Sequence, residues 1–338
     1  MKKLLALILA VCLLSGCAQS PKPGKTSYTA TFLDLFDTVT TVVGYADSRE
    51  EFEAQAQQIH DELAYYHELF DIYNPSQHGA NLWTVNENAG VCPVQVAPQI
   101  LELLTDCKSY YELTDGRVNV AMGAVLRLWH EARSRGIKDP AGAKLPSEQA
   151  LEEAAKHTDM DGLVLDPVES TVYLTDPEMS LDVGAVAKGW ATQKVAQDAP
   201  RGMLISVGGN VCATGQKPGD KDWVIGIQNP DGGEYLHTVY VSGGSVVTSG
   251  DYQRTYWVDG KAYHHIIDPD TRMPGTLYRS VTVICPDSGL ADALSTALFL
   301  LPLEQGMALA KSCGADAMWL DAQGQEHWTP GFEAIIRT

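Results

Sequence analysis

The stretch from Ser249 to Pro274 reads SGDYQRTYWVDGKAYHHIIDPDTRMP and predicts a β-hairpin. Two runs of alternating character, Gln253 to Val258 and Lys261 to Ile267, stand on either side of Asp259-Gly260. That dipeptide supplies the positive φ values that a tight two-residue hairpin turn requires. The pattern therefore predicts a turn between two strands in the C-terminal half of the chain.

Two histidines lie on the second predicted strand. His264 and His265 should point to opposite faces because side chains alternate along a strand. Pairing must stop at Asp268-Pro269, since proline has no amide hydrogen to donate. We expect one of the two imidazoles to face the interior, either as a structural residue beside the Asp-Pro turn or as part of a site.

The chain begins with MKKLLALILAVCLLSGC, which has the layout of a secretory signal: lysines, an apolar run, and small residues before Cys17. The apolar run from Leu4 to Leu14 is too short to span a bilayer stably. We expect a lipoprotein signal peptide at residues 1–16, acylation of Cys17, and a lipidated tether at residues 17–27. The protein would then be exported and anchored at the outer face of the plasma membrane or on the periplasmic side. An ordinary signal with a chance cysteine is the alternative.

Composition limits the function of the remaining residues, 28–338, which are enough for one domain with a large core. The formal net charge of −19 opposes binding to nucleic acid. An anionic ligand would need local help from backbone amides, a helix N-terminus or a bound cation. The cysteines after Cys17 are odd in number and show no CxxC spacing, so neither a disulfide framework nor a zinc site is indicated.

Helical and strand patterns are interspersed without a regular β-α-β rhythm. This predicts an α+β fold in which mixed or antiparallel sheets pack with helices. Helices are expected at residues 49–70, 98–113, 122–132, 147–156, 182–196, 291–301 and 303–312. A polar surface loop is expected at residues 133–146.

The helix predicted at residues 291–301 carries a carboxylate and a hydroxyl four residues apart. Asp292 and Thr296 should therefore point to the same side of the helix. Oxygen ligands of this kind suit a hard cation such as Mg²⁺. The alternative is that Asp292 caps the helix and Thr296 bonds back to the backbone.

Three other segments are candidates for ligand contact. Asp182 to Gly189 brings free N–H groups, small residues and Lys188 to a helix start, which favours phosphate binding or close packing on a sheet. Ser206 to Asn210 ends a strand in a glycine turn that permits close backbone approach. Tyr73 suits stacking on a flat ring, or ordinary packing.

The order of these motifs resembles that of the ApbE family of FAD:protein FMN transferases, which are often lipoproteins. The resemblance extends from about Thr31 to Leu320 and implies an ApbE-like domain over residues 28–338. The motifs that carry it are Phe36-Asp37-Thr38, Tyr73, Asp115-Gly116, Asp182 to Gly189, Ser206 to Asn210, Ser249 to Tyr252, His265 to Pro269, and Asp292 to Thr296.

The resemblance implies a reaction as well as a fold. Members of the family bind FAD and Mg²⁺, attach FMN through its phosphate to a threonine of a partner flavoprotein, and release AMP. For this chain the acceptor would be a threonine-bearing flavoprotein, such as a membrane redox subunit. The alternatives are an FAD hydrolase that gives FMN and AMP, and a lipoprotein that binds FAD without turnover.

The resemblance also assigns residues to three tasks. The FAD-binding residues would be Phe36, Tyr73, Arg117, Val118, Asn119, Asp182, Lys188 and His265. The metal ligands would be Asp292, Thr296 and the backbone carbonyl of Ala185. The catalytic residues would be His265, Lys188 and Asp292, with His265 as the candidate general base, facing FAD, and His264 facing away.

Three positions depart from the family pattern. Arg272 stands where a glycine usually follows Asp-Pro-x-Thr, so the turn must form without that permissive residue. Asn119 stands where an aspartate is common, which puts one ribityl or adenine contact in doubt. Gly289 stands where some members have a further acidic metal ligand.

Overall fold

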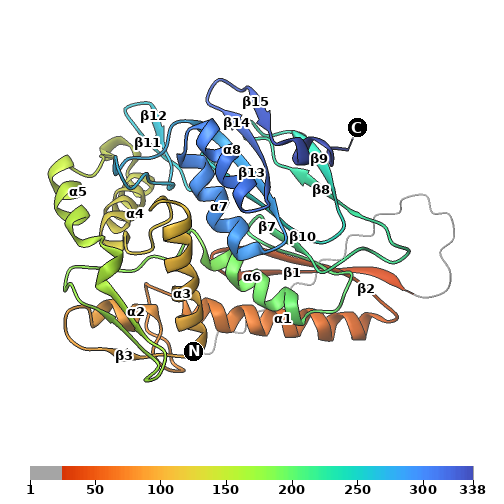
Figure 1. The fold of residues 1–338 in the computed structure, drawn as a ribbon, viewed down its shortest axis with the longest axis horizontal. Coiled ribbons are helices and arrows are strands. Elements are labelled where there is room, and N and C mark those ends of the chain that lie inside the picture. Colours follow the sequence, from red (N-terminus) through yellow and green to blue (C-terminus); the bar gives the residue numbers. More distant parts are fainter. Residues whose placement is uncertain (1–24, 338) are drawn as a thin grey trace.

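The computed structural model describes residues 25–337. The predicted signal peptide at residues 1–16, the acylation site Cys17, and residues 17–24 of the tether lie outside the described residues. Within the described range, no helix has the length and hydropathy needed to cross a membrane. The prediction of an α+β fold is confirmed: helices surround a large sheet (Figure 1).

Helices and strands are distributed along the whole described chain. The helices are α1 (Arg49–Leu69), α2 (Leu82–Glu87), α3 (Pro98–Leu113), α4 (Gly123–Lys138), α5 (Glu148–Ala154), α6 (Ala187–Asp198), α7 (Ser288–Leu300), α8 (Leu303–Ser312) and α9 (Pro330–Glu333). The strands are β1 (Thr26–Leu35), β2 (Thr38–Ala46), β3 (Val94–Gln95), β4 (Leu163–Asp166), β5 (Thr171–Leu174), β6 (Leu204–Val207), β7 (Asn210–Ala213), β8 (Trp223–Ile227), β9 (His237–Val241), β10 (Gly244–Gly250), β11 (Tyr256–Val258), β12 (Lys261–Tyr263), β13 (Tyr278–Cys285), β14 (Asp316–Asp321) and β15 (Glu326–Trp328).

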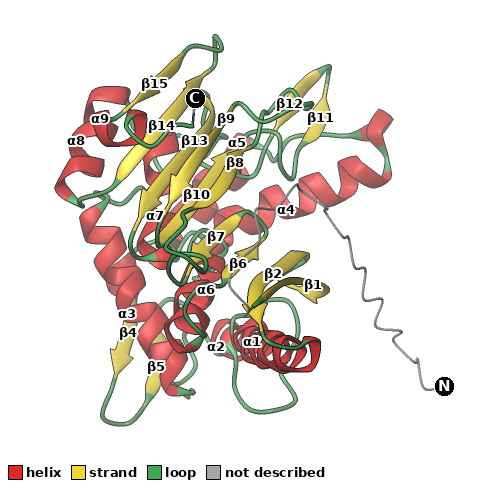
Figure 2. Ribbon diagram, turned by 90° about the vertical axis from the view of Figure 1, so that its right-hand side faces the viewer, coloured by secondary structure: helices red, strands yellow, loops and turns green. Residues whose placement is uncertain are grey.

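The large sheet has eight strands in the order β1-β2-β6-β7-β10-β13-β14-β15, and each neighbouring pair is antiparallel. Helix α7 packs on the face that carries Val247, Val281 and Val283. The β8–β9 hairpin covers the opposite face at Val246 and Met318. Figure 2 shows α7 and α8 on one side of this sheet and β8 and β9 on the other.

The N-terminal end of the sheet is covered by α1, in agreement with the helix predicted at residues 49–70. Its apolar residues recur at helical spacing, and the buried ones include Phe52, Ala56 and Leu63. The Ser48 side chain accepts the N–H of Glu51 and so satisfies one of the free donors of the first turn. Burial along one stripe therefore fixes α1 against β1 and β2.

The hairpin predicted from residues 249–274 forms around the expected turn but is shorter. Asp259 and Gly260 have φ values of 50° and 76°, while the paired strands are only β11 and β12. His264 lies beyond β12 because its imidazole turns into the core: Nε2 donates to the carbonyl of Gly275 at 2.8 Å, and the ring contacts Phe299 edge-on. The prediction that one strand carries both histidines is therefore wrong.

Helix α4 continues to Lys138, so the surface loop predicted at residues 133–146 is wrong over its first part. The helix continues because it packs at Gly136, where a Cβ atom would lie 2.8 Å from the ring of Tyr256. The polar residues of this stretch occupy the outer face of a helix, and their composition was misread as a loop.

Helix α6 begins at Ala187, five residues later than the helix predicted at residues 182–196. The Asp182 side chain accepts the N–H of Gly184 at 2.9 Å and holds residues 182–186 in a turn. Local side-chain bonding of this kind competes with helix formation. The turn places Gly184 and Ala185 in the wall of the cavity described below.

Helices α6 and α7 approach closely at Gly189. The Gly189 N–H donates to Oδ2 of Asp292 at 2.8 Å. A Cβ atom at position 189 would collide with the Cβ of Asp292 and with the carbonyl oxygen of Ser288. This close approach brings Lys188 and Asp292 together.

We predict that Gly189→Ala destabilises the protein, because the added methyl group must push α6 away from α7. The expected loss is about 2 kcal/mol in the free energy of unfolding, measured by denaturant titration. The matched control is Gln197→Ala on the exposed face of α6, which should change stability by less than about 0.5 kcal/mol. A Gly189→Ala protein as stable as the wild type would contradict the close approach.

Candidate functional site

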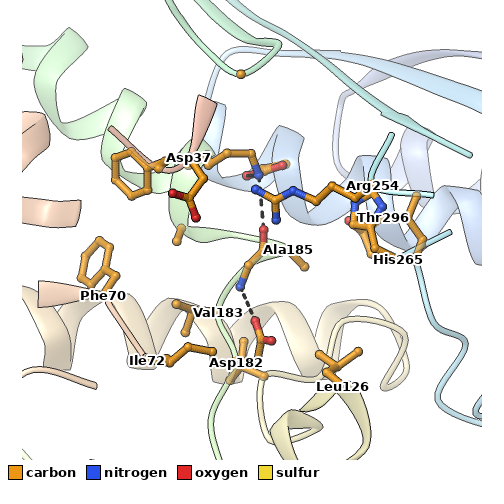
Figure 3. Close-up of a pocket in the computed structure, with 18 of the residues that line it drawn as sticks. Asp37, Phe70, Ile72, Leu126, Asp182, Val183, Ala185, Arg254, His265 and Thr296 are labelled. Carbon is orange, nitrogen blue, oxygen red and sulfur yellow. Dashed lines mark hydrogen bonds and ion pairs between the residues drawn. The ribbon is translucent and has the colours of Figure 1, made fainter. Parts of the chain in front are cut away.

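A cavity of about 580 Å³ lies where the turn between β1 and β2, α4, the turn at residues 182–186, α7 and the segment after β12 meet. Its volume is within the range of small-molecule sites. Figure 3 shows Asp37 and Phe70 at one side of this cleft, Asp182 and Ala185 in the middle, and His265 with Thr296 at the other side.

The residues predicted for ligand, metal and catalysis come together around this cleft, although they lie far apart in the sequence. Those that line it are Phe36, Tyr73, Arg117, Val118, Asn119, Asp182, Ala185, Lys188, His265, Asp292 and Thr296. The fold thus places these side chains at one site. Their individual roles remain predictions.

The Asp292 carboxylate lies at the floor of the cleft and is only 5% exposed. Burial raises its pKa, while the ammonium group of Lys188 and the Gly189 N–H oppose that rise. Oδ2 lies 3.8 Å from Nζ of Lys188, whereas Oδ1 takes part in no hydrogen bond with residues 25–337. A buried carboxylate with one oxygen uncommitted is suited to bind a cation.

The other two residues predicted to supply metal ligands also line the cleft: Thr296, one helical turn further along α7, and Ala185. Hydroxyl and carbonyl oxygens suit a hard divalent cation. In the described part of the chain, no three His, Cys, Asp or Glu side chains gather as a metal-binding group. A cation here would therefore depend on one carboxylate, one hydroxyl, backbone and ligand oxygens.

Gly289 lies outside this set of donors. A Cβ atom at this position would face the Tyr110 hydroxyl and the backbone of Trp190, between α3 and α6. Gly289 does not line the cleft. The glycine at this position, where some family members have an acidic residue, therefore does not affect Asp292, Thr296 or Ala185.

A chain of polar groups, Tyr73, His130 and Asp182, runs along one wall. The Tyr73 hydroxyl lies 2.8 Å from Nδ1 of His130, and Nε2 of His130 lies 4.0 Å from Oδ2 of Asp182. Burial lowers the pKa of His130, partly offset by the Asp182 charge. Burial of its hydroxyl end and the same carboxylate raise the pKa of Tyr73 to about 12, although much of the ring is exposed, so the hydroxyl stays protonated and can donate to the neutral imidazole.

Sequence reasoning did not identify His130 or Arg254, which both line the cleft. A signal for His130 is present: Leu126 and His130 are four residues apart on α4 and face the same side. Arg254 adopts φ 47° just before the hairpin, and nothing in the local pattern indicates that its guanidinium turns toward the cleft.

Arg117 and Asn119, which were predicted to contact FAD, form bonds to other residues of the protein. Arg117 pairs with Asp268 at 3.3 Å and with Asp270 at 2.6 Å, so its charge holds the loop after the hairpin. The Asn119 amide donates to the carbonyl of Thr158 at 3.0 Å and accepts the N–H of Ala121 at 2.8 Å. An aspartate could not make the first of these bonds, because an ionised carboxylate cannot donate.

Nδ1 of His265 lies 3.2 Å from the carbonyl oxygen of Gln253, to which it donates. Burial lowers the pKa of His265 to about 3, and the nearby Arg254 charge acts in the same direction. The imidazole is therefore neutral at pH 7, and its Nε2 lone pair is free to accept a hydrogen bond. His264 does not line the cleft.

Arg272 adopts φ 60°, a left-handed conformation that favours glycine. Its N–H donates to the Asp268 carbonyl at 2.7 Å, and its carbonyl accepts the indole N–H of Trp129 at 2.9 Å. These bonds hold the turn in shape without glycine.

The model of the ApbE family matches residues 27–319. Two relatives named FAD:protein FMN transferase are 35% identical over 270 residues (Treponema pallidum; 74% of this chain, 73% of the relative) and 32% identical over 263 residues (Klebsiella pneumoniae; 76% and 78%). The crystal structure of the ApbE protein from Thermotoga maritima is 28% identical and covers 93% of this chain and 100% of its own, with a TM-score of 0.82. The flavin transferase ApbE from Vibrio cholerae, 22% identical with a TM-score of 0.75, covers 92% of this chain and 99% of its own and shares the fold.

We predict that Arg254→Gln raises the pKa of His265, because it removes a positive charge that disfavours the imidazolium form. Imidazole NMR signals followed from pH 7 to pH 3 measure the change. Arg201→Gln, an equal loss of charge at an exposed position outside the cleft, is the control and should leave His265 unchanged. An unchanged pKa in both variants would contradict the placement of Arg254.

Proposed function

The chain belongs to the ApbE family, and on this basis we propose that it transfers FMN from FAD to a threonine hydroxyl of a partner flavoprotein. The observation that carries the proposal is the cleft that joins Asp292, Lys188 and the Asp182–Ala185 turn. It combines the volume for a nucleotide with a local cation in a chain of net charge −19. Such local positive charge is what an anionic substrate needs in an acidic protein.

The proposed transfer is one displacement at phosphorus. The hydroxyl oxygen of the acceptor forms a bond to the phosphorus of the FMN half of FAD. The bond from that phosphorus to the bridging oxygen breaks, and AMP leaves with its electron pair. The hydroxyl proton passes to a base or to water. This chain supplies no covalent intermediate, so its residues act by positioning and by electrostatic stabilisation.

Lys188 and Arg254 are the cleft cations that would face the pyrophosphate. The side chain of Lys188 also donates to the Gly184 carbonyl at 3.3 Å, which keeps its ammonium group beside the turn. We propose that Mg²⁺ is held by Asp292, Thr296 and the Ala185 carbonyl; when bound, it would neutralise charge on the phosphates. The oxygen-only donor set and the uncommitted Oδ1 of Asp292 fit this ion.

His265 is the proposed acceptor of the hydroxyl proton. Its neutral imidazole has Nε2 available, while the Gln253 carbonyl fixes the ring through Nδ1. Its low pKa makes it a weak base until a negative charge is bound beside it. Positioning of the hydroxyl therefore contributes more to the rate than proton removal, as expected for a loose phosphoryl-transfer step.

A second candidate activity is hydrolysis of FAD to FMN and AMP, with water in place of the hydroxyl. The open side of the cleft supports it, because Tyr73 is 62% exposed and water can reach the site. Release of free FMN in the absence of an acceptor protein distinguishes the two activities.

We further propose that the mature protein is exported and anchored through acylated Cys17, with a membrane redox subunit as its acceptor. The proposal rests on the signal-like sequence that ends in Leu14-Ser15-Gly16-Cys17. A tethered enzyme would meet an acceptor on the same membrane at a high effective concentration.

We predict that Asp292→Asn lowers the rate of FMN transfer at least about a hundredfold, because the neutral amide no longer binds a cation beside the phosphates. Mass spectrometry of an FMN-free acceptor subunit, incubated with enzyme, FAD and Mg²⁺, measures the covalent gain of FMN. FAD affinity should change far less than the rate. Asp220→Asn, at an exposed position, is the control for the same chemical change. Absence of covalent flavin with the wild-type enzyme at every Mg²⁺ concentration would contradict the proposed transfer.

We predict that Cys17→Ala moves the protein from the membrane fraction to the soluble exported fraction, because no thiol remains for acylation. Cell fractionation with immunodetection measures the distribution. Cys92→Ala, at an exposed cysteine of the described chain, should leave it unchanged. Equal membrane retention of all three proteins would rule out the lipid anchor.

A further inference from the structure

A second cavity, of about 520 Å³, adjoins the cleft. Thr248 and Gln253 line both cavities, and the neighbouring residues Gly208 and Gly209 line one each. The second cavity lies between β7, β10, β8 and the loop at residues 228–235. The two cavities therefore share part of their wall.

That shared wall is bonded to the proposed reaction centre. Gln253 accepts the hydrogen bond from Nδ1 of His265 at 3.2 Å. Ser249, which follows Thr248 on β10, bonds through its hydroxyl to Ser295 at 2.8 Å, one residue before Thr296 on α7. A group that crosses this wall enters the cleft close to both His265 and Thr296.

The electrostatic character of the second cavity differs from that of the cleft. Glu234 is the single charged residue among those that line it, whereas Lys188, Arg254 and Arg117 line the cleft. A nucleotide phosphate would find no cation there. An uncharged ligand is favoured.

Much of the wall of the second cavity is exposed backbone. Gly209, Gly232 and Gly233 have no heavy atom within 4 Å of the position that a Cβ would occupy. Strand β8 pairs with β9 on one edge, and β9 is bridged at Ile336 on its far side; in the described part of the chain the other edge of β8 has no strand partner. Free strand edges and open glycine backbone recognise extended peptides by main-chain hydrogen bonds.

Aromatic rings complete the second cavity. Tyr235 is 65% exposed, and its ring covers Gly226 of β8. Tyr252 lies across the cavity beside Gln253. Exposed tyrosines such as Tyr235 are typical contact residues at protein interfaces.

We propose that this second cavity, hereafter the acceptor groove, binds an extended segment of the acceptor polypeptide. The segment adds along the free edge of β8 and the glycine backbone, and its hydroxyl-bearing residue passes over Thr248 and Gly208–Gly209 into the cleft. The inference rests on the proposed FMN transfer, which needs a protein hydroxyl from outside the chain. It assigns recognition of the acceptor to a surface separate from the FAD contacts.

The test fills the groove without touching the cleft. Gln228 lines the groove, is exposed, and does not line the cleft. Gln228→Trp should raise the KM for an FMN-free acceptor subunit by about tenfold or more, the loss of one good contact. The affinity for FAD, measured by flavin fluorescence, should stay at the wild-type value. Gln323→Trp, the same exchange in an exposed turn away from both cavities, should change neither quantity.

Tyr235→Ala is a second variant, in which the ring over Gly226 is removed rather than the groove filled. It should also raise the KM for the acceptor while FAD affinity is unchanged. Thermal unfolding of each variant shows whether a loss reflects misfolding. If Gln228→Trp and Tyr235→Ala, both folded, transfer FMN with the wild-type KM, the groove is not the acceptor site. If either variant lowers the affinity for FAD as well as raising the KM for the acceptor, part of the nucleotide lies in the groove and the inference is overturned.

A cross-linking readout needs no turnover. Gln228→benzoylphenylalanine, irradiated with the acceptor subunit in the absence of FAD, should yield an adduct on the peptide that contains the acceptor threonine. An adduct on a distant surface of the acceptor would overturn the assignment. Failure of wild-type transfer in the mass-spectrometric assay would instead overturn the proposed function, so the two failures are distinguishable.

Discussion

The contact between α6 and α7 is the constraint on which the site depends. Gly189 lets the two helices approach until its N–H reaches Asp292, and the buried carboxylate is stabilised by that bond and by Lys188. A buried carboxylate that lost these two partners would lower the free energy of unfolding, because its charge would be left uncompensated. The folded state therefore keeps Lys188 and the Gly189 N–H next to Asp292. Thr296, on the same helix as Asp292, and the Asp182–Ala185 turn, just before α6, line the same cleft. The proposed cation and phosphate sites therefore both depend on this one helix crossing.

Sequence patterns predicted the parts that depend on local periodicity or on short motifs. The α+β class, α1, and the turn at Asp259-Gly260 are confirmed. The errors lie where tertiary contacts override local preference: α4 extends because Gly136 packs on Tyr256, and the second hairpin strand ends because His264 turns into the core. Arg254 was missed because a single polar residue carries no spacing signal, and His130 was missed although its four-residue spacing from Leu126 was present in the sequence; the relevance of both appears only when distant segments meet around the cleft.

The electrostatics of the cleft explain how an acidic protein can serve an anionic substrate. Burial holds His130 and His265 neutral by lowering their pKa values, so the positive charge that faces a ligand comes from Lys188 and Arg254. Arg117 is instead committed to Asp268 and Asp270. The acceptor groove next to the cleft has no cation among its lining residues. We therefore assign the nucleotide to the cleft and the acceptor polypeptide to the groove.

We propose that Asp292, Thr296 and the Ala185 carbonyl hold a cation against a nucleotide bound in the cleft. Anomalous diffraction from crystals grown with FAD and Mn²⁺ is the decisive measurement, because it locates the metal without reference to activity. The predicted result is a single metal peak bound to Oδ1 of Asp292, with the phosphates of FAD beside Lys188. A nucleotide bound elsewhere, or a metal peak away from Asp292, would contradict the claim.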